Sequence, residues 1–460
     1  AGVNRSCEFK DSVMLNVSQH KTALADANYL VVGLGVTGHS VARYLLGHGY
    51  RCRIQDTREL TPQLVKLNAE FDTVDFNAGP LDKELLEWAD VLVVSPGLSI
   101  QQDAIQQAID LGKTVVGDIE LFARLVDKPV IAITGSNGKS TVTTLVGEMI
   151  ALDEKAVAVG GNIGTAALDL LEQNPDFYVL ELSSYQLETT TSLQPRVAAL
   201  LNLCEDHLDR YSGYAEYIQA KLRIYDNASV CVSNLDDEVT RHDAGDITFS
   251  LSPDSDADFR LLEGDGLWLA HRDEPWISVN DIKLTGRHNW ANCLAAMAIA
   301  HSVGISRAAI VAAMETFAGI PHRGQWVAEI DGVEWINDSK ATNVGAAQAS
   351  IEGRERPVIL IAGGQSKGAD MTVMSETIRQ KVKLALLMGE DADRLQQAWQ
   401  DTTRVERVRD MQEAVKRAHE VASSGDCVLL APACASFDMY PKFEARGDDF
   451  MQRVRELAVD

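Results

Sequence analysis

PVIAITGSNGKST occupies residues 129–141, and its pattern predicts the local architecture around it. A short β-branched run enters a turn broken by Gly135 and Gly138, and an apolar helical pattern follows at once. The two glycines let backbone N–H groups approach phosphate oxygens, while Lys139 can reach the outer phosphates and the Ser140 hydroxyl can ligate Mg²⁺. The start of the helix adds the positive end of its dipole. The stretch therefore predicts a strand, a triphosphate loop and a helix.

The loop departs from the strict P-loop pattern at one position. G-x-x-x-x-G-K-[ST] requires glycine at position 133, where this chain has Ile133. A tighter variant anchored on Gly135 is indicated, and a plain glycine turn with a solvated lysine is the alternative. The residues expected to bind ATP here are Gly135, Ser136, Asn137, Gly138, Lys139, Ser140 and Thr141.

Composition limits the class of protein. A chain of 460 residues suffices for about three domains. The net charge of −25 argues against nucleic acid as the main partner, and no apolar run is long enough for a membrane span. Seven scattered cysteines without a CxxC pair indicate reduced thiols in a cytoplasmic protein, with no disulfide frame or zinc site. Residues 1–22 lack the apolar core of a signal peptide, which leaves a non-native tail and an upstream extension as alternatives.

Apolar strand-like runs alternate with helical patterns almost throughout, which predicts an α/β protein with mainly parallel sheets. We expect three domains after the tail. They are an N-terminal Rossmann-like domain over 23–117, a central P-loop-type, ATPase-like sheet over 118–319 and a C-terminal Rossmann-like domain over 320–460. The polar segment 233–279 is expected to be β-rich or irregular, and a helix is expected from Asn289 to Ala300.

The first domain carries a second glycine pattern. Gly33, Gly35 and Gly38 fit the dinucleotide fingerprint after a strand, and Asp56 falls near the ribose-binding position. Alone, this pattern predicts an NAD-dependent dehydrogenase. Because such an enzyme has no need of the triphosphate loop, reuse of the fold for another phosphorylated ligand is favoured over cofactor binding.

Charged residues follow two strands of the central domain. Glu181 ends an apolar strand beside the loop, where a Mg²⁺ ligand belongs, although a solvated strand end is the alternative. His207 lies in an acidic cluster after the next strand, and on chemistry alone it would be an unusual magnesium ligand, better suited to capping or substrate binding. Lys221 lies in a helical pattern, which ordinarily indicates a surface lysine.

Three polar loops follow strands of the C-terminal domain, at 337–343, 363–370 and 431–438. The first packs Asp338, Lys340 and several amide and hydroxyl groups into seven residues, although a capped turn would use similar residues. Because the ends of parallel strands meet at one edge of a sheet, the three loops predict a second pocket.

In sum, these motifs closely resemble the Mur ligases of peptidoglycan synthesis, over about residues 29–455. The resemblance rests on GDIELF (117–122), TGSNGKST (134–141), GNIG (161–164), ELSSYQLE (181–188), EDHLDRY (205–211), NDSKATN (337–343), PACASFD (432–438) and FEARG (443–447). One departure is Gln325, where the family commonly has glutamate, so a charged role at that position is in doubt.

The resemblance implies an ATP-dependent ligase that adds D-glutamate to UDP-N-acetylmuramoyl-L-alanine through an acyl phosphate. It also implies two Mg²⁺ ions, and a carbamate formed from CO₂ on Lys221. The implied metal-binding residues are Ser140, Glu181, His207 and Lys221, and the implied catalytic residues are Lys139, His207, Lys221, Asp338 and Lys340.

Substrate contacts are implied in the same way. Those for the UDP substrate are Val36, Thr37, Asp56, Thr57, Arg58, Gly97, Asn162, Ser183, Gln186 and Asp206. Further ATP contacts are Asn289, Asn292, Arg323 and Asp338, and those for D-glutamate are Thr342, Lys367, Ser436, Phe437 and Phe443. A monomer without nucleic acid or membrane partners is expected. A ligase for another amino acid or for folylpolyglutamate, a dehydrogenase and a non-catalytic nucleotide-binding module are the rivals, and the glycine pattern at 33–38 disfavours the folate version.

Overall fold

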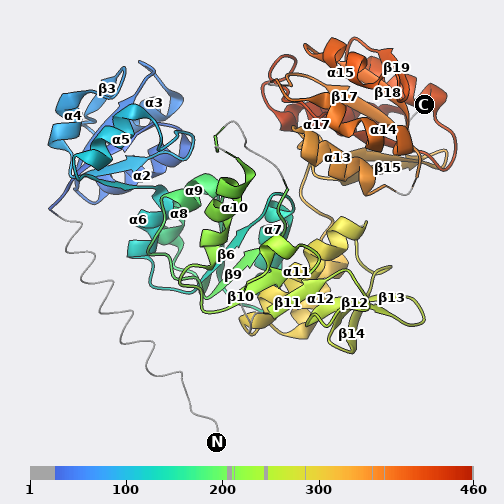
Figure 1. Cartoon of the computed structure of the whole chain (residues 1–460), viewed down its shortest axis with the longest axis horizontal. Coiled ribbons are helices and arrows are strands. Elements are labelled where there is room, and N and C mark those ends of the chain that lie inside the picture. The colour runs from blue at the N-terminus through green and yellow to red at the C-terminus, as the bar shows by residue number, and fades with distance from the viewer. Residues whose placement is uncertain are drawn as a thin grey trace, which may run out of the picture. The chain divides into compact units, whose positions relative to one another are not determined.

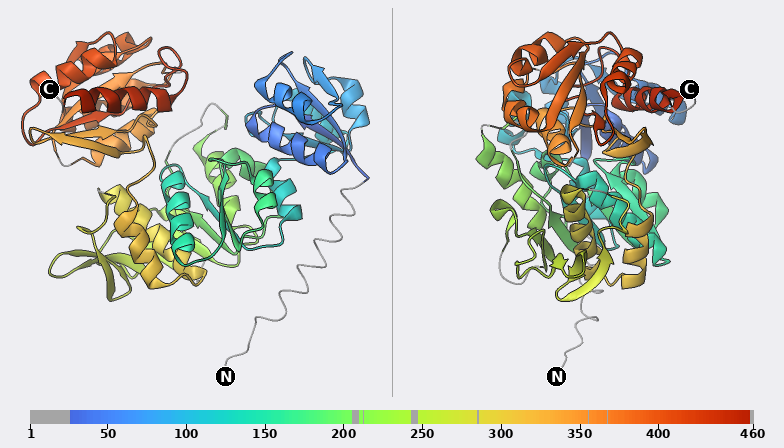
Figure 2. Two further views of the ribbon diagram at one scale, coloured as in Figure 1. Left: turned by 180° about the vertical axis from the view of Figure 1, so that it is seen from behind. Right: turned by 90° about the vertical axis from the view of Figure 1, so that its right-hand side faces the viewer.

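The computed structural model describes residues 26–204, 210–211, 213–242, 247–284, 286–354, 356–366 and 368–457. Three open sheets with flanking helices follow one another along this part of the chain, which confirms the predicted three-domain α/β class (Figures 1 and 2). One compact unit comprises Ala1–Val279 with Ala291–Met314, and the other Asn280–Trp290 with Glu315–Asp460. Within the ranges described, no helix has the length and apolar character needed to cross a membrane.

The first sheet is parallel, with the strand order β3-β2-β1-β4-β5. Its strands are β1 (Asn28–Val32), β2 (Arg51–Asp56), β3 (Phe76–Ala78), β4 (Val91–Val94) and β5 (Thr114–Val116), and its helices are α2 (Val36–Gly47), α3 (Pro62–Glu70), α4 (Lys83–Trp88) and α5 (Asp103–Asp110). Tyr29 and Val31 of β1 pack in the cluster that contains α2, and Leu30 and Val32 pack against α4 and α5. Strand order reverses between β1 and β4, and in open α/β sheets ligands bind at the carboxyl ends of the strands at such a point.

The middle sheet has the order β14-β13-β12-β11-β10-β9-β6-β8-β7 in the described residues. Its strands are β6 (Val130–Thr134), β7 (Val157–Gly161), β8 (Phe177–Glu181), β9 (Val197–Leu200), β10 (Cys231–Asn234), β11 (Ile247–Ser250), β12 (Phe259–Glu263), β13 (Leu267–His271) and β14 (Glu274–Ser278). The helices in this part of the chain are α6 (Asp118–Leu125), α7 (Lys139–Leu152), α8 (Ala167–Leu170), α9 (Ser184–Glu188), α10 (Tyr214–Leu222), α11 (Arg287–Ser302) and α12 (Arg307–Thr316), with 3₁₀ turns η1 (Leu171–Gln173), η2 (Arg223–Tyr225) and η3 (Glu238–Thr240).

The segment 233–279 is β-rich, as expected. It continues the middle sheet, because β11 pairs in parallel with β10 and the antiparallel strands β12, β13 and β14 follow at the edge. The helix expected from Asn289 to Ala300 is also present, within α11.

The third sheet has the order β15-β16-β20-β17-β18-β19, parallel except for the β15–β16 hairpin. Its strands are β15 (Gln325–Ile330), β16 (Val333–Asn337), β17 (Val358–Gly363), β18 (Val382–Met388), β19 (Arg404–Arg407) and β20 (Cys427–Leu430), and its helices are α13 (Val344–Glu352), α14 (Ser375–Lys381), α15 (Ala392–Trp399), α16 (Met411–Val421) and α17 (Phe443–Leu457), with the 3₁₀ turn η4 (Met371–Met374). Alternate residues of β17 pack on opposite faces: Leu360 with α13, α14 and α15, and Ile359 and Ile361 with α16 and α17. Burial on both faces explains the continuous apolar run.

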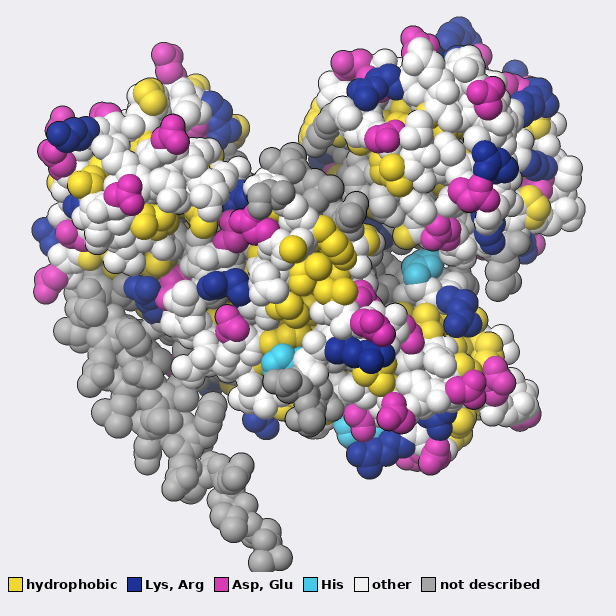
Figure 3. Space-filling view, in the orientation of Figure 1, with side chains coloured by type: hydrophobic (Ala, Val, Ile, Leu, Met, Phe, Trp, Pro, Cys, Tyr) yellow, Lys and Arg dark blue, Asp and Glu magenta, His cyan; other side chains and the backbone are white. Residues whose placement is uncertain are grey.

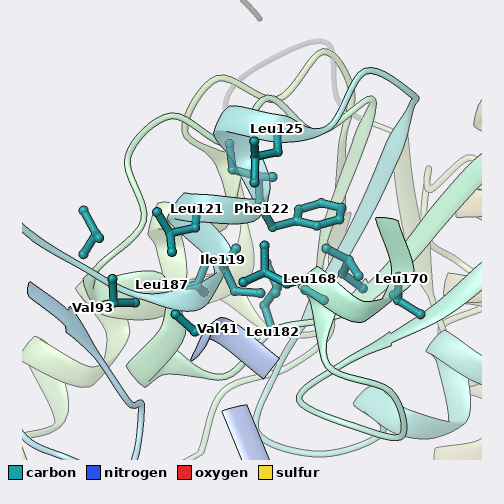
Figure 4. Packing of buried hydrophobic residues seen from close by; sticks show 14 of the residues in the cluster. Val41, Val93, Ile119, Leu121, Phe122, Leu125, Leu168, Leu170, Leu182 and Leu187 are labelled. Atoms are coloured by element: carbon teal, nitrogen blue, oxygen red, sulfur yellow. The ribbon is translucent and has the colours of Figure 1, made fainter. Parts of the chain in front are cut away.

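Helix α6 lies within an apolar cluster shared by the first and middle sheets (Figure 4). Ile119 and Phe122 of α6 are fully buried there, together with Val41 of α2, Leu168 of α8 and Leu182 after β8. Each Å² of apolar surface removed from water stabilises the fold by about 25 cal/mol. Because α6 buries several large apolar side chains, it is held firmly between its neighbours. The polar residues at the start of α6 are therefore held in place as well.

Charge is distributed evenly over the visible surface. On the face shown in Figure 3, Lys and Arg side chains are interspersed with Asp and Glu side chains. The face shown therefore lacks the one-sided basic surface that is typical of nucleic-acid-binding proteins.

Candidate active site

The loop between β6 and α7, predicted to bind phosphate, has a backbone that requires glycine and is held by hydrogen bonds. Gly138 has φ of +79°, and a Cβ there would lie 2.2 Å from Asn292 Oδ1, so only glycine fits. The N–H groups of Ser136 and Asn137 donate to the backbone oxygen and side-chain Oδ1 of Asn202, at 2.9 and 2.8 Å. These contacts fix the loop against the segment after β9, next to the N-terminus of α7, and a helix N-terminus is a position at which proteins bind anions.

Lys139 curls back over this loop. Its Nζ donates to the carbonyl oxygens of Gly135 and Ser136 at 2.8 and 2.9 Å. The cation therefore lies above the loop, beside the N–H groups at the helix start. This is the position from which a lysine neutralises a terminal phosphate.

Two residues predicted to ligate metal lie together. Ser140 Oγ donates to Glu181 Oε2 at 2.5 Å, and Asn162 Nδ2 donates to Glu181 Oε1 at 2.7 Å. Glu181 is only 2% exposed, so it is not a solvated strand end. Hydroxyl and carboxylate oxygens are the ligands that Mg²⁺ prefers. The described residues contain no group of three or more His, Cys, Asp and Glu side chains suited to a metal ion.

Lys221 is buried, which corrects the surface position expected from its helical pattern. Only 2% of it is exposed, and its Nζ donates to Thr134 Oγ1 at 2.9 Å and to the Gly135 carbonyl at 3.0 Å. Its helix, α10, places it against the end of β6, because Tyr217 one turn earlier bonds Ser136 Oγ at 3.0 Å. The helical pattern alone does not predict this burial, because tertiary packing brings α10 onto the loop, and only the family resemblance places Lys221 at the site.

The segment after β8 is held by a capping box. The Ser183 N–H donates to Gln186 Oε1 at 3.1 Å, and the Gln186 N–H donates to Ser183 Oγ at 3.2 Å. Gln186 Nε2 donates in turn to Asp118 Oδ2 of α6 at 3.1 Å. Two predicted substrate residues are thus joined to each other and to α6. The neighbouring predictions at Asp206 and His207 lie outside the described residues.

Asp56 is engaged by protein donors. It receives the Leu34 N–H at 2.7 Å on Oδ2, and Arg58 at 2.8 Å on Oδ1 and 2.7 Å on Oδ2. Hydrogen bonds from Arg58 hold the pKa of the Asp56 carboxyl well below its usual range. Both oxygens of Asp56 therefore bind protein groups at the ends of β1 and β2. In a dehydrogenase, the carboxylate at this position would instead accept hydrogen bonds from the ribose of the cofactor. The predicted residues Val36, Thr57, Arg58 and Gly97 are exposed around these strand ends, and Thr37 is half-buried.

The loops of the third sheet meet at a buried arginine that the sequence did not single out. Arg446 of α17 donates to Ser339 Oγ at 3.0 Å, to the Ser339 carbonyl at 2.9 Å and to the carbonyls of Gly363 and Cys434 at 3.4 and 3.2 Å. Burial lowers the pKa of Arg446 to about 10. One guanidinium thus joins the loops after β16, β17 and β20. Only its place in the FEARG motif could have pointed to it.

The predicted residues of this region lie on those loops. Lys340 Nζ lies 4.2 Å from the centre of the Phe443 ring, and burial raises the pKa of Asp338 against the opposing charges of Arg354 and Arg323. Ser436 is buried and Phe437 is exposed, whereas Lys367 lies outside the described residues.

Gln325 and Asn289 are two further predicted positions in the second compact unit. Gln325 Oε1 accepts the His322 N–H at 2.9 Å, a structural role that needs no charge. Asn289 and Arg323 belong to this unit, whereas Asn292 lies against Gly138 in the first.

Comparison with known proteins identifies the family. A model of the MurD-like Mur ligase N-terminal domain matches residues 27–117, one of the Mur ligase middle domain matches 133–300, and one of the Mur ligase glutamate ligase domain matches 322–434. The chain belongs to the Mur ligase family.

Mur ligase relatives align over nearly the whole chain. UDP-N-acetylmuramoylalanine–D-glutamate ligase of Pseudomonas fluorescens is 48% identical over 93% of this chain and 98% of its own length, and the protein of that name from Alcanivorax borkumensis is 48% identical over 94% and 98%. Among solved structures, the Mur ligase MurC from Thermotoga maritima has a TM-score of 0.60 with 19% identity, covering 94% of this chain and 100% of that one. A pseudomurein peptide ligase type C from Methanothermus fervidus has a TM-score of 0.60 with 17% identity and the same coverage. These two likenesses show the fold.

Proposed function

We propose that this chain is an ATP-dependent ligase that joins D-glutamate to UDP-N-acetylmuramoyl-L-alanine, releasing ADP and phosphate, in peptidoglycan synthesis. The observation that carries the proposal is the 48% identity, over 93% of the chain, to relatives named for this activity. The loop after β6 supports it, because an amide ligase of this kind must hold ATP.

ATP activates the substrate carboxylate in the proposed reaction. A carboxylate is a poor electrophile, so its oxygen first attacks the γ-phosphate, and ADP leaves. The acyl phosphate is then attacked by the amine of D-glutamate, and phosphate leaves as the amide forms. Lys139 and the N–H groups at the start of α7 would stabilise the charge on the transferring phosphoryl group, since their geometry is set before substrate arrives.

Two Mg²⁺ ions are part of the proposal. The Ser140 and Glu181 oxygens would hold one ion, because both are hard donors and their side chains meet beside the loop. When bound, Mg²⁺ neutralises phosphate charge during transfer. We assign His207 to the second site by family resemblance.

A carbamate on Lys221 would add an anionic oxygen donor at the same place. Its formation joins the lysine nitrogen to the carbon of CO₂: the ammonium group first loses one proton, and the neutral amine loses a second as the bond to carbon forms. Lys221 Nζ lies by the loop, within 3.0 Å of the Gly135 carbonyl, and its burial would shield a carbamate from water. The carbamate would replace a buried cation with an anion that can hold metal.

The substrates are divided among the domains in this proposal. We assign 23–117 to the uridine diphosphate, 118–319 to ATP and the muramoyl-alanine arm, and 320–460 to D-glutamate. Thr342, Lys367, Ser436, Phe437 and Phe443 would hold D-glutamate, with Lys367 pairing a carboxylate, and Asp338 and Lys340 would act beside them. Asn289 and Arg323 would contact ATP. The protein would work as a monomer in the cytoplasm.

A phosphate-release assay tests the function. The protein is incubated with UDP-N-acetylmuramoyl-L-alanine, ATP and Mg²⁺, and each amino acid of a panel is added in turn. Release that requires D-glutamate is expected. Equal phosphate release with L-alanine or a diamino acid would reject the proposed specificity. If no amino acid of the panel stimulates phosphate release, the chain is not a ligase of this kind.

A further inference from the structure

The GDIELF motif at the start of α6 has no role in the reaction proposed above, yet it places two carboxylates inside the protein. Asp118 is 3% exposed and Glu120 is 1% exposed. Acidic residues in the first turn of a helix usually lie at the surface, where they favour the helix dipole. Here both point to the same segment, residues 183–192, which follows the Glu181 strand end.

Glu120 is fully used as an anchor. Its Oε2 accepts the N–H groups of Thr191 and Ser192 at 2.7 and 2.9 Å, and its Oε1 accepts Ser192 Oγ at 2.8 Å and Arg124 Nε at 2.9 Å. Buried carboxylates with this many donors hold a backbone turn in place. Nothing in this arrangement reaches the site residues.

Asp118 has a different environment. Its Oδ2 accepts one hydrogen bond, from Gln186 Nε2 at 3.1 Å, and its Oδ1 has no partner among the residues that the structure describes. Burial raises the pKa of Asp118 to about 6. Because the backbone N–H groups at the start of α6 also stabilise the charged form, Asp118 is not isolated, and Gln186 is its one side-chain donor among the described residues.

The Gln186 carboxamide has two different ends, and its contacts with Asp118 and Ser183 depend on which end faces which neighbour. An ionised carboxylate can only accept hydrogen bonds, so Gln186 must turn its NH₂ group toward Asp118. The carbonyl end then faces Ser183, where Oε1 accepts the Ser183 N–H at 3.1 Å and Ser183 Oγ at 3.2 Å. The Ser183 N–H can only donate, so it favours the same orientation, and Asp118 holds the other end of the carboxamide in place.

We propose that Asp118 is a positioning residue for substrate binding, which fixes the carboxamide of Gln186 and, through it, the hydroxyl of Ser183. The inference rests on the proposed function, in which Ser183 and Gln186 hold the muramoyl-alanine arm. Asp118 itself does not touch substrate. It acts from α6, whose apolar residues lock it between the first and middle sheets (Figure 4).

The decisive experiment exchanges donor and acceptor. Gln186→Glu keeps an oxygen for the Ser183 N–H but sets a carboxylate against Asp118, and it is expected to raise the KM for UDP-N-acetylmuramoyl-L-alanine by about tenfold or more. Adding Asp118→Asn restores a donor–acceptor pair with reversed direction, and should return this KM to within about threefold of wild type. Asp118→Asn alone should change it little, because the asparagine oxygen still accepts from Gln186 Nε2.

A matched pair of variants separates positioning from folding. Asp118→Leu and Glu120→Leu each remove a buried carboxylate from one turn of α6. Both should lower the melting temperature. Only Asp118→Leu should raise the KM for the UDP substrate by about tenfold, with the KM for ATP within about twofold.

Three results would overturn the proposal: a double variant as impaired as Gln186→Glu alone, an unchanged KM in Asp118→Leu, or equal KM changes in the Asp118 and Glu120 variants. Failure of the proposed function would look different, because wild-type protein would then release no phosphate that depends on D-glutamate.

Discussion

Two glycine loops of this chain have the same order of strand, turn and helix, yet they are built for different tasks. In the loop after β1, a Cβ on Gly38 would lie 2.0 Å from the Gly33 carbonyl oxygen, so that glycine serves close packing of α2 on β1. The loop after β6 adds a lysine and a hydroxyl, and a buried carboxylate lies at the end of β8, the strand beside β6 in the sheet. The glycines set the backbone of both loops, and the groups around them decide the chemistry.

The largest effect is expected from Lys139→Ala. Turnover should fall by about a thousandfold or more, because the transferring phosphoryl group loses its cation. Affinity for the UDP substrate should stay within about twofold, since the loop after β1 is untouched. Phosphate release and calorimetric titration measure the two quantities. The matched control is Lys128→Ala, which changes an exposed lysine just before β6. If Lys139→Ala lost turnover and UDP-substrate affinity together, the loops after β1 and β6 would not bind different substrates.

Lys221→Ala tests the proposed carbamate beside the loop after β6. Activity should drop by about a hundredfold or more if an anion at this position holds metal, and a short carboxylate such as formate should restore part of it. Wild-type activity should also fall after CO₂ is removed from the buffer and recover when bicarbonate is added. Indifference to both treatments would reject the carbamate.

Arg58→Ala probes the surroundings of the loop after β1, because Arg58 follows β2 and donates to the Leu34 carbonyl of that loop at 3.5 Å. Its guanidinium is exposed at the end of β2 and oriented by Asp56. Loss of one charge-assisted contact to a diphosphate should raise the KM for UDP-N-acetylmuramoyl-L-alanine by about tenfold and leave that for ATP unchanged. A change in both constants would show that the loops do not work separately.

The smallest effect concerns stability. Because Arg58 depresses the pKa of Asp56 in the folded protein, this carboxylate contributes stability that is present above its unfolded pKa of about 4 and is lost as pH falls toward the folded value. Asp56→Asn should lower the melting temperature by about 2–4 °C at pH 7, and the difference should shrink below about pH 4. Melting curves from pH 7 to pH 3 measure it, and a difference independent of pH would contradict the assignment.

The sequence was most informative where chemistry and chain order coincide. Glu181 and the Gly-Lys-Ser loop could be placed because strand ends, glycines and a helix start are local patterns. Lys221 could not, since a lysine on a helix is buried only when another element covers it, as the end of β6 does here. Asp118 and Arg446 were hidden for the same reason. Their partners lie 68 and up to 107 residues away, and no spacing rule connects them.

The outer strand of the middle sheet has a consequence of its own. β14 ends that sheet as an edge, and an open edge offers unpaired amides to other chains. Pro275 removes one of those amides, and Glu274 next to it forms an ion pair with Arg307. An incoming strand would meet a missing donor and a charged pair. Both features disfavour the addition of a further strand at this edge of the middle sheet.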